Sequence, residues 1–386
     1  MARILDPLST LAILAGMLAG LPLLGAWLAG QPPACCLQFP PDPGSVAHAP
    51  FSWPAFAFLS TLTAAVLAWL GRRAAESWRR SLPAAAVRRH PFPRWGILAA
   101  AMGAGAWALA WTRFDWFAPF QEHTFTPLWL AYIVVVNAAC VARTGGSPLT
   151  DRPGLLIGLF PASALFWWFF EYLNRFVANW TYSGTHLDAW SYFWSATLPF
   201  STVLPAVLST QTLVRSFPAL QRAFGRVRPL PQAGSRLWAW FALLAAATGL
   251  VGIGVRPDWF YPLVWVAPLA LLIAIRALRR QPHPLQDLAT PDWTAPASAA
   301  LAALVCGVFW EMWNYWSLAR WTYSIPYAHR FEIFEMPLLG YAGYLPFGLE
   351  CAAVMALVED FIGDRRRAES ARRNACAAHG RALDLD

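Results

Sequence analysis

The sequence contains no lysine, and all 29 of its basic residues are arginine. Without an amine side chain, Schiff-base chemistry with retinal or pyridoxal phosphate is excluded. Charge of either sign is also scarce, since 13% of the 386 residues are charged, whereas about 25% is usual in soluble proteins. The chain is instead 58% apolar and holds 23 tryptophans, a residue that concentrates at membrane–water interfaces. This composition favours lipid as the solvent.

Motifs for metals, cofactors and covalent catalysis are missing as well. The six cysteines form no CxxC pair, and no histidine cluster has the spacing of a zinc site. There is no aspartate-rich motif, glycine-rich phosphate loop or GxSxG elbow. The net charge of +8 comes from arginines between apolar runs rather than from a basic stripe. We therefore expect no metal, no cofactor and no nucleic-acid partner, and no pattern indicates an oligomeric state.

Long apolar runs predict an all-α, polytopic transmembrane bundle of about ten spans, because about 20 apolar residues cross the hydrocarbon layer. Arginines crowd the segments 72–94, 215–236 and 365–373, and the segment 30–51 has none. The positive-inside rule then predicts a multi-pass protein of the cytoplasmic (inner) membrane with both termini in the cytoplasm. The expected spans are 8–29, 52–71, 95–112, 126–142, 154–174, 193–214, 237–255, 259–278, 298–319 and 333–358.

Five motifs recur in the same order, at offsets of 136–143 residues. This predicts a tandem, parallel repeat of a four-helix unit, because an even number of spans keeps both copies in one orientation. The expected arrangement is 2 + 4 + 4, with an N-terminal extension (1–92), a first repeat (93–233), a second repeat (234–362) and an arginine-rich tail (363–386). The paired motifs are Arg-x-Asp-Trp-Phe-x-Pro (113–119 and 256–262), Pro-Leu-x-Asp (148–151 and 284–287), Glu-x-x-Asn (171–174 and 311–314), Trp-Thr-Tyr-Ser (180–183 and 321–324) and Phe-x5-Pro (193–199 and 331–337).

The repeated Glu-x-x-Asn motif places Glu171 with Asn174, and Glu311 with Asn314, on one helical face. A charged side chain inside a span costs about 2.5–3.5 kcal/mol, so each acid should face the bundle interior. Arg175 is a possible partner for Glu171. Two interpretations remain open: a matched pair of functional acids across a pseudo-twofold axis, or polar pairs that hold helices together.

The Trp-Thr-Tyr-Ser tetrads end the same helices. An aromatic belt at the outer interface explains Trp180, Tyr182, Trp321 and Tyr323. Their repetition also suits a lid over the acids, in which case they line a substrate cavity. Trp310 and Trp313, beside Glu311, would line the same cavity.

The second repeat alone carries additional acids, Glu335 and Glu350, where the first repeat has uncharged residues. Glycines and Pro346 before Glu350 predict a broken or unwound stretch. His329 is either a solvated loop histidine or a member of the site. These differences favour the second repeat as the working half.

Residues 310–350, and more weakly 166–205, resemble the integral-membrane lycopene cyclase domain family and its carotenoid-hydratase relatives. The resemblance is carried by Trp310-Glu311, by the Trp-x-Tyr turn at 321–323, by the run Phe-Glu-Ile-Phe-Glu-Met-Pro at 331–337 and by Pro-Phe-Gly-Leu-Glu at 346–350. It implies a duplicated helical unit in which Glu311 is the helix acid, and Glu335 or Glu350 the proline-linked acid. The adjacent paired acids of the family are missing after Pro337.

We therefore expect a membrane protein that binds or modifies a long apolar isoprenoid, carotenoid or lipid-like molecule, as a cofactor-independent cyclase, hydratase or isomerase. Burial raises the pKa of a carboxylic acid, so that it can protonate an alkene beside aromatic rings that stabilise the cation. In this scheme Glu311 is the proton donor, Asn314 orients it, and Glu335 or Glu350 is the base. The alternatives are a proton- or cation-coupled transporter that uses Glu171 and Glu311, and a structural membrane subunit.

Overall fold

The computed structural model describes residues 7–41, 47–79, 90–183, 187–230 and 235–383, with side chains up to 363. Within these residues the secondary structure is helical apart from two short two-stranded sheets, and loops join the helices. The expected all-α class is confirmed. The predicted positions of the two chain termini concern residues that lie outside the described ranges.

Six described helices have the length and composition of membrane spans, and up to eight if each of two bent helix pairs is one span. The chain therefore has the architecture of a multi-pass membrane protein, while the expected count of ten stays a prediction. The six are α1 (Pro7–Leu28), α3 (Trp53–Arg79), α5 (Phe125–Thr144), α7 (Pro153–Val177), α11 (Arg236–Val255) and α14 (Thr294–Tyr315). The bent pairs are α4 (Arg94–Trp111) with η1 (Asp115–His123), at 107°, and α12 (Pro257–Phe260) plus η3 (Tyr261–Trp265) with α13 (Ala267–Leu278), at 55°.

The expected spans at 193–214 and 333–358 are both interrupted, the second of them at the predicted break before Glu350. The first is α8 (Ala189–Phe200) followed by α9 (Val203–Arg215). The second begins as β3 (Glu332–Ile333), β4 (Met336–Pro337) and the 3₁₀ turn η5 (Leu338–Gly343), and only then enters α15 (Tyr344–Leu383). The remaining short helices are α2 (Pro33–Leu37), α6 (Pro148–Asp151), α10 (Pro218–Phe224) and η4 (Pro284–Ala289).

Proline explains both interruptions. Pro205 is the third residue of α9 and Pro346 is the third residue of α15. Proline has no N–H, so it fits in the first turn of a helix, where that N–H would have no partner, and it breaks a helix interior. The unwound stretch predicted before Glu350 is the 3₁₀ turn η5.

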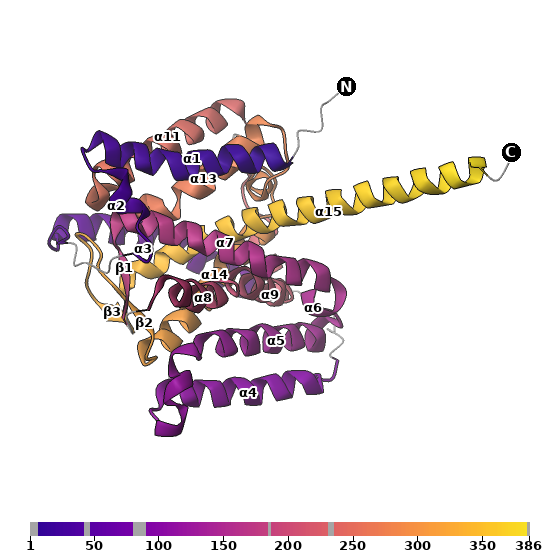
Figure 1. Cartoon of the computed structure of the whole chain (residues 1–386), viewed down its shortest axis with the longest axis horizontal. Helices are drawn as coiled ribbons and strands as arrows, with labels where there is room; N and C mark the ends of the chain where they lie inside the picture. The colour runs from indigo at the N-terminus through magenta and orange to yellow at the C-terminus, as the bar shows by residue number, and fades with distance from the viewer. Residues whose placement is uncertain (1–6, 42–46, 80–89, 184–186, 231–234, 384–386) are drawn as a thin grey trace.

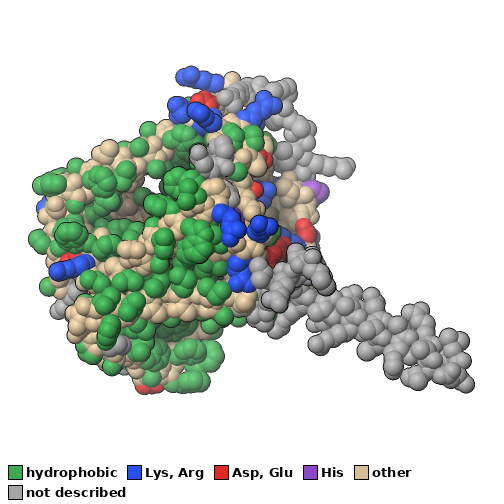
Figure 2. Space-filling model, turned by 90° about the horizontal axis from the view of Figure 1, so that it is seen from above, with side chains coloured by type: hydrophobic (Ala, Val, Ile, Leu, Met, Phe, Trp, Pro, Cys, Tyr) green, Lys and Arg blue, Asp and Glu red, His purple; other side chains and the backbone are tan. Residues whose placement is uncertain are grey.

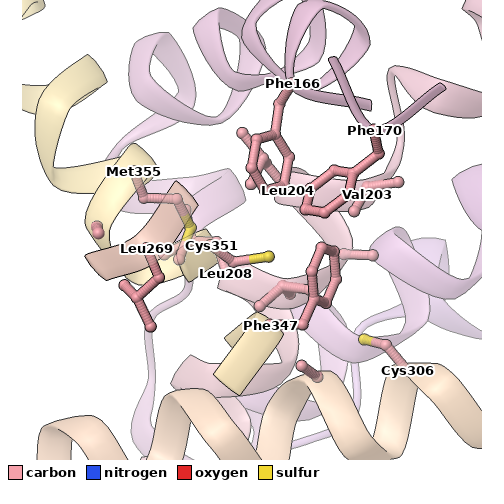
Figure 3. Close-up of a cluster of buried hydrophobic side chains, with 14 of the residues drawn as sticks. Phe166, Phe170, Val203, Leu204, Leu208, Leu269, Cys306, Phe347, Cys351 and Met355 are labelled. Atoms are coloured by element: carbon pink, nitrogen blue, oxygen red, sulfur yellow. The ribbon is translucent and has the colours of Figure 1, made fainter. Parts of the chain in front are cut away.

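The core is formed by residues of α5, α7, α9, α11, α13, α14 and α15, and Figure 3 shows the part of it around α7, α9, α14 and α15. Phe166 and Phe170 on α7 point at Val203 and Leu204 on α9, with Phe347 of α15 on the other side. The rings of Phe166 and Phe347 stack at 5.8 Å between centroids. The core therefore joins helices from both expected repeats.

The two N-terminal helices attach to the bundle in different ways. α1 lies against α11, because glycines let the backbones touch: a Cβ on Gly25 would lie 2.1 Å from the Val251 carbonyl oxygen. α3 is held at its ends, where Arg73 donates to the Arg226 carbonyl at 2.8 Å and the Ser52 N–H donates to the Tyr327 carbonyl at 2.9 Å. No residue of α3 between Trp53 and Arg72 is buried.

Figure 1 shows the main helices lying side by side, with the sheet of β1 (Trp180–Ser183) and β2 (Arg320–Tyr323) at one end. α1 begins, and α15 extends away, at the opposite end. Apolar side chains cover most of the body in the space-filling view (Figure 2). An even number of crossings follows from this arrangement if the bundle lies across a membrane.

Two charged side chains bind distant segments instead of charged neighbours in the sequence. Arg175 donates to the carbonyl oxygens of Cys36 and Gln38, at 3.2 and 2.6 Å, rather than pairing with Glu171. Asp258 accepts from the Ala49 N–H at 2.9 Å and contacts His48 Nδ1 at 2.8 Å. Both side chains therefore hold the N-terminal extension, because chain segments far away in sequence supply closer partners.

Candidate functional site

The first Trp-Thr-Tyr-Ser tetrad is strand β1, and strand β2 contains Arg320 and the first three residues of the second tetrad; the two strands pair as an antiparallel sheet. Thr181 lies opposite Thr322, and Trp180 lies opposite Tyr323. The equivalent residues, 141 positions apart, are thus related by a local twofold axis between the two threonines. Residues i and i+2 of a strand, and residues directly opposite, share a face of a sheet. All four aromatic side chains of the tetrads therefore lie on one face.

The repeated asparagines hold these strands. The Asn174 amide donates to the Trp180 carbonyl at 2.7 Å and its oxygen accepts from the Asn179 N–H at 2.8 Å. In the second half, Asn314 donates to the Trp321 carbonyl at 2.7 Å and accepts from the Trp321 N–H at 2.8 Å. Asn314 thus binds main chain, and no hydrogen bond among the described residues joins it to Glu311, so the expected role of orienting the acid is not seen.

Glu171 lies near the end of α7 and is buried. Its Oε1 accepts three hydrogen bonds: from Trp167 Nε1 at 3.1 Å, from Trp180 Nε1 at 3.0 Å and from the Tyr182 hydroxyl at 2.6 Å. Two of the donors come from the first tetrad. The tetrad therefore caps the acid, as expected of a lid.

Glu311, on α14, is fully buried. Its Oε1 accepts from the Tyr323 hydroxyl at 2.8 Å and from the Tyr344 hydroxyl at 2.7 Å. Trp321 Nε1 donates to the Tyr323 hydroxyl at 2.8 Å instead of to the acid. The other oxygen of Glu311, Oε2, is buried and has no hydrogen-bond partner among the described residues. One carboxyl oxygen of Glu311 is thus without a hydrogen-bond partner among the described residues.

The two repeats carry side chains of different size at two positions near the acids, and this explains why the two acids have different hydrogen-bond donors. When Glu171 is aligned with Glu311, Trp167 corresponds to Gly307. When Pro205 is aligned with Pro346, Val203 corresponds to Tyr344. A Cβ on Gly307 would lie 2.4 Å from the Tyr344 ring. Gly307 is therefore what admits the Tyr344 hydroxyl to the acid. A residue-by-residue alignment of the two repeats carries this signal, although Trp167, Gly307 and Tyr344 are not among the expected site residues.

The tyrosines of the sheet are neutral donors. Burial, together with the nearby Glu171 carboxyl, raises the pKa of Tyr182 well above its usual value, and burial with Glu311 does the same for Tyr323. Each phenol therefore keeps its proton and presents it to a carboxyl oxygen.

Aromatic rings fill the interior between the two acids. Trp310 stacks on Tyr344 at 5.9 Å and lies 6.4 Å from Trp167, with Phe347 about equally close to both indoles at 6.1 and 5.9 Å. Trp129 contacts both Trp310 and Trp313, and Trp313 packs further against Trp107, Tyr132 and Phe309. Among the described residues no side chain donates to both Glu171 and Glu311. The aromatic rings of Trp167, Phe347 and Trp310 pack against one another between the two acids.

The other expected site residues lie apart from this cluster. His329 contacts Glu332 at 2.8 Å and accepts from the Ile325 N–H at 3.3 Å. Glu335 pairs with Arg320 at 3.2 Å, at the edge of β2. Glu350 is buried in α15, and its Oε2 has no partner among the described residues. None of the three donates to or accepts from Glu311.

Within the described residues no group of three or more histidine, cysteine, aspartate or glutamate side chains is arranged to hold a metal ion. Comparison with known proteins finds no matching family model, no matching curated protein and no matching solved structure. The resemblance to the lycopene cyclase domain family therefore stays a prediction from the sequence.

Proposed function

We propose that the chain is a membrane-embedded, cofactor-independent acid–base catalyst that acts on a long apolar molecule with carbon–carbon double bonds. The observation that carries this proposal is the pair of phenol donors on Glu311 Oε1, with Oε2 buried and unpartnered. A charged carboxylate would leave one anionic oxygen without a donor among aromatic rings, which is costly. A carboxylic acid that carries its proton on Oε2 fits the same contacts, because a carbonyl oxygen accepts two hydrogen bonds.

The surroundings of Glu311 suit an apolar substrate. Tyr344, whose hydroxyl donates to the acid, stacks on Trp310, and Trp310 packs against Phe347. Among the described residues no basic side chain forms an ion pair with Glu311. Transfer of the Oε2 proton to an alkene carbon would create a carbocation, which ring faces stabilise. Loss of a proton from a neighbouring carbon to the resulting carboxylate restores the acid. The net reaction is an isomerisation or a cyclisation without any co-reactant.

The two acids have different roles in this proposal. Glu171 Oε1 is occupied by three donors, two of them indoles, so this acid serves to hold the first tetrad. Glu311 is the reacting group. Glu335, paired with Arg320, and Glu350, which makes no hydrogen bond with the donors to Glu311, are left out of the proton transfer.

Deuterium incorporation tests the reaction. Membranes that contain the protein are incubated in D₂O with an isoprenoid hydrocarbon mixture, and the extracted hydrocarbons are analysed by mass spectrometry. We expect solvent deuterium in one product with the wild type and with Glu171→Gln, and none with Glu311→Gln. Equal incorporation in membranes without the protein, or no loss in Glu311→Gln, would overturn the proposal.

The equivalence of the two acids favours one alternative, a proton-coupled transporter. Both carboxyls accept hydrogen bonds from side chains on one face of the same sheet. In that case Glu171→Gln and Glu311→Gln should abolish proton-linked uptake in proteoliposomes to the same extent. The catalytic proposal instead requires the two variants to differ.

A further inference from the structure

An open cavity of about 420 Å³ lies at the turn between α5 and α7, at the end of these helices away from the β1–β2 sheet. Its lining includes Gly145, Gly146, Asp151 and Arg152, with Thr212 of α9 on the far side. Because α5 and α7 are candidate spans, the cavity is at a membrane surface. It is remote from Glu311 and independent of the function proposed above.

The turn is built so that its backbone and its acid are held in place. Gly145 ends α5 with a positive φ of 84°, a conformation that favours glycine. A Cβ on Gly146 would lie 2.2 Å from Asp151 Oδ2. Ser147 and Thr150 then cap α6 reciprocally. The Asp151 carboxylate is therefore fixed against the Gly146 backbone.

Opposite charges stand next to each other on the cavity wall. Asp151 Oδ1 accepts from the Thr150 hydroxyl at 2.6 Å, and Oδ2 accepts no hydrogen bond among the described residues. Arg152 Nη1 donates to Glu359 at 2.9 Å, and its side chain is 50% exposed, which leaves further guanidinium N–H donors available. The Gly146 N–H also has no partner among the described residues. The wall offers both an anion and hydrogen-bond donors.

An apolar stripe of α7 leads from this cavity toward the middle of the span. Gly154, Ile157, Pro161 and Leu165 are exposed, at spacings of three or four residues that place them on one helical face. Ile157 is 66% exposed and Leu165 is 73% exposed. In a membrane, hydrocarbon chains cover this stripe.

We propose that the cavity binds the headgroup of a phospholipid that has a primary ammonium group, as in phosphatidylethanolamine. The ammonium lies against Asp151, and the phosphate accepts from Arg152 and from the Gly146 N–H. The acyl chains follow the stripe of Ile157 and Leu165. Charge complementarity selects this ligand: an anionic headgroup without an ammonium would face the carboxylate, and a trimethylated ammonium has no N–H to donate to it.

Lipid competition tests the assignment. The purified protein is placed in nanodiscs, and the association of phosphatidylethanolamine, phosphatidylcholine and phosphatidylglycerol probes with identical chains is compared. We expect a preference of about tenfold for phosphatidylethanolamine, since a hydrogen bond between charged groups is worth at least that factor. Asp151→Asn should abolish the preference. Arg152→Gln should weaken all three lipids alike.

Asp287→Asn is the matched control, because Asp287 occupies the same place in the repeated Pro-Leu-x-Asp motif. It should leave the preference unchanged. Equal binding of the three probes, or an unchanged preference in Asp151→Asn protein of normal melting temperature, would overturn the proposal. Displacement of the lipid probe by millimolar soluble phosphoethanolamine would also do so, because it would show that the chains do not contribute. None of these results depends on the activity of Glu311.

Discussion

At the scale of single residues, the buried acids are distinguished by their donors rather than by their burial. Trp167, Trp180 and Tyr182 all donate to one oxygen of Glu171. If this acid is neutral, glutamine is nearly isosteric and keeps the accepting oxygen. We expect Glu171→Gln to change the free energy of unfolding by less than about 1 kcal/mol. Glu171→Leu leaves three donors without this acceptor, among them the buried Trp180 indole, and should cost at least about 2 kcal/mol. Thermal unfolding in detergent measures both, and equal losses in the two variants would contradict the account.

The contact between Gly307 and Tyr344 provides a second test at this scale. The Cβ of Gly307→Ala would collide with the Tyr344 ring, and overpacking typically costs about 1–3 kcal/mol. Replacing Tyr344 by valine, the residue at the equivalent position 203, removes the ring. The double variant Gly307→Ala with Tyr344→Val should therefore be destabilised by less than the sum of the single variants. Additive losses would show that the two residues do not contact each other.

At the scale of secondary-structure elements, each asparagine of the Glu-x-x-Asn motif joins a helix end to a strand. Asn174 and Asn314 both bind the main chain of the tetrad tryptophans. We expect Asn174→Ala and Asn314→Ala to lower the free energy of unfolding by similar amounts, about 1–3 kcal/mol. They should also speed amide hydrogen exchange in the β1–β2 sheet. Asn179→Ala is the control, because the Asn179 side chain is buried but makes no hydrogen bond.

The register of the β1–β2 sheet allows a direct test of its pairing. Residues directly opposite in an antiparallel pair have Cα atoms about 4.5–5.5 Å apart, which suits a disulfide. Thr181 and Thr322 are opposite each other. We expect Thr181→Cys with Thr322→Cys to cross-link on mild oxidation, as shown by peptide mapping. Thr181→Cys with Ser324→Cys, displaced by two residues, should cross-link much more slowly.

At the scale of the whole molecule, the helix bundle has two distinct ends. The tetrads lie at one end, and the start of α1 and the exit of α15 lie at the other (Figure 1). The arginine pattern predicts that the second end faces the cytoplasm. Single cysteines introduced at Ser183 should then react with an impermeant maleimide in intact cells. Cysteines introduced at Thr150 should react only after the membrane is opened; the reverse pattern would show that the predicted orientation is wrong.

Composition and repetition along the chain were enough to predict several features. The low charge and long apolar runs predicted the helical membrane architecture, because a lipid-exposed backbone must bond within its own helix. Comparison of the repeats identified Glu171 and Glu311, and suggested that the tetrads cover them. Proline and glycine positions predicted the break before α15. All of these features depend on the properties of residues that are close together in the sequence.

Other features depend on which distant segments meet when the helices pack. Residue patterns did not reveal that the two tetrads pair with each other, that Tyr344 reaches Glu311, or that Arg175 and Asp258 bind the N-terminal extension. A side chain binds whichever partner packing brings close to it, and for these residues that partner is far away in the sequence. The unpartnered oxygen of Glu311 is such a consequence, because the space left by Gly307 directs the Tyr344 hydroxyl onto the oxygen that Tyr323 already occupies.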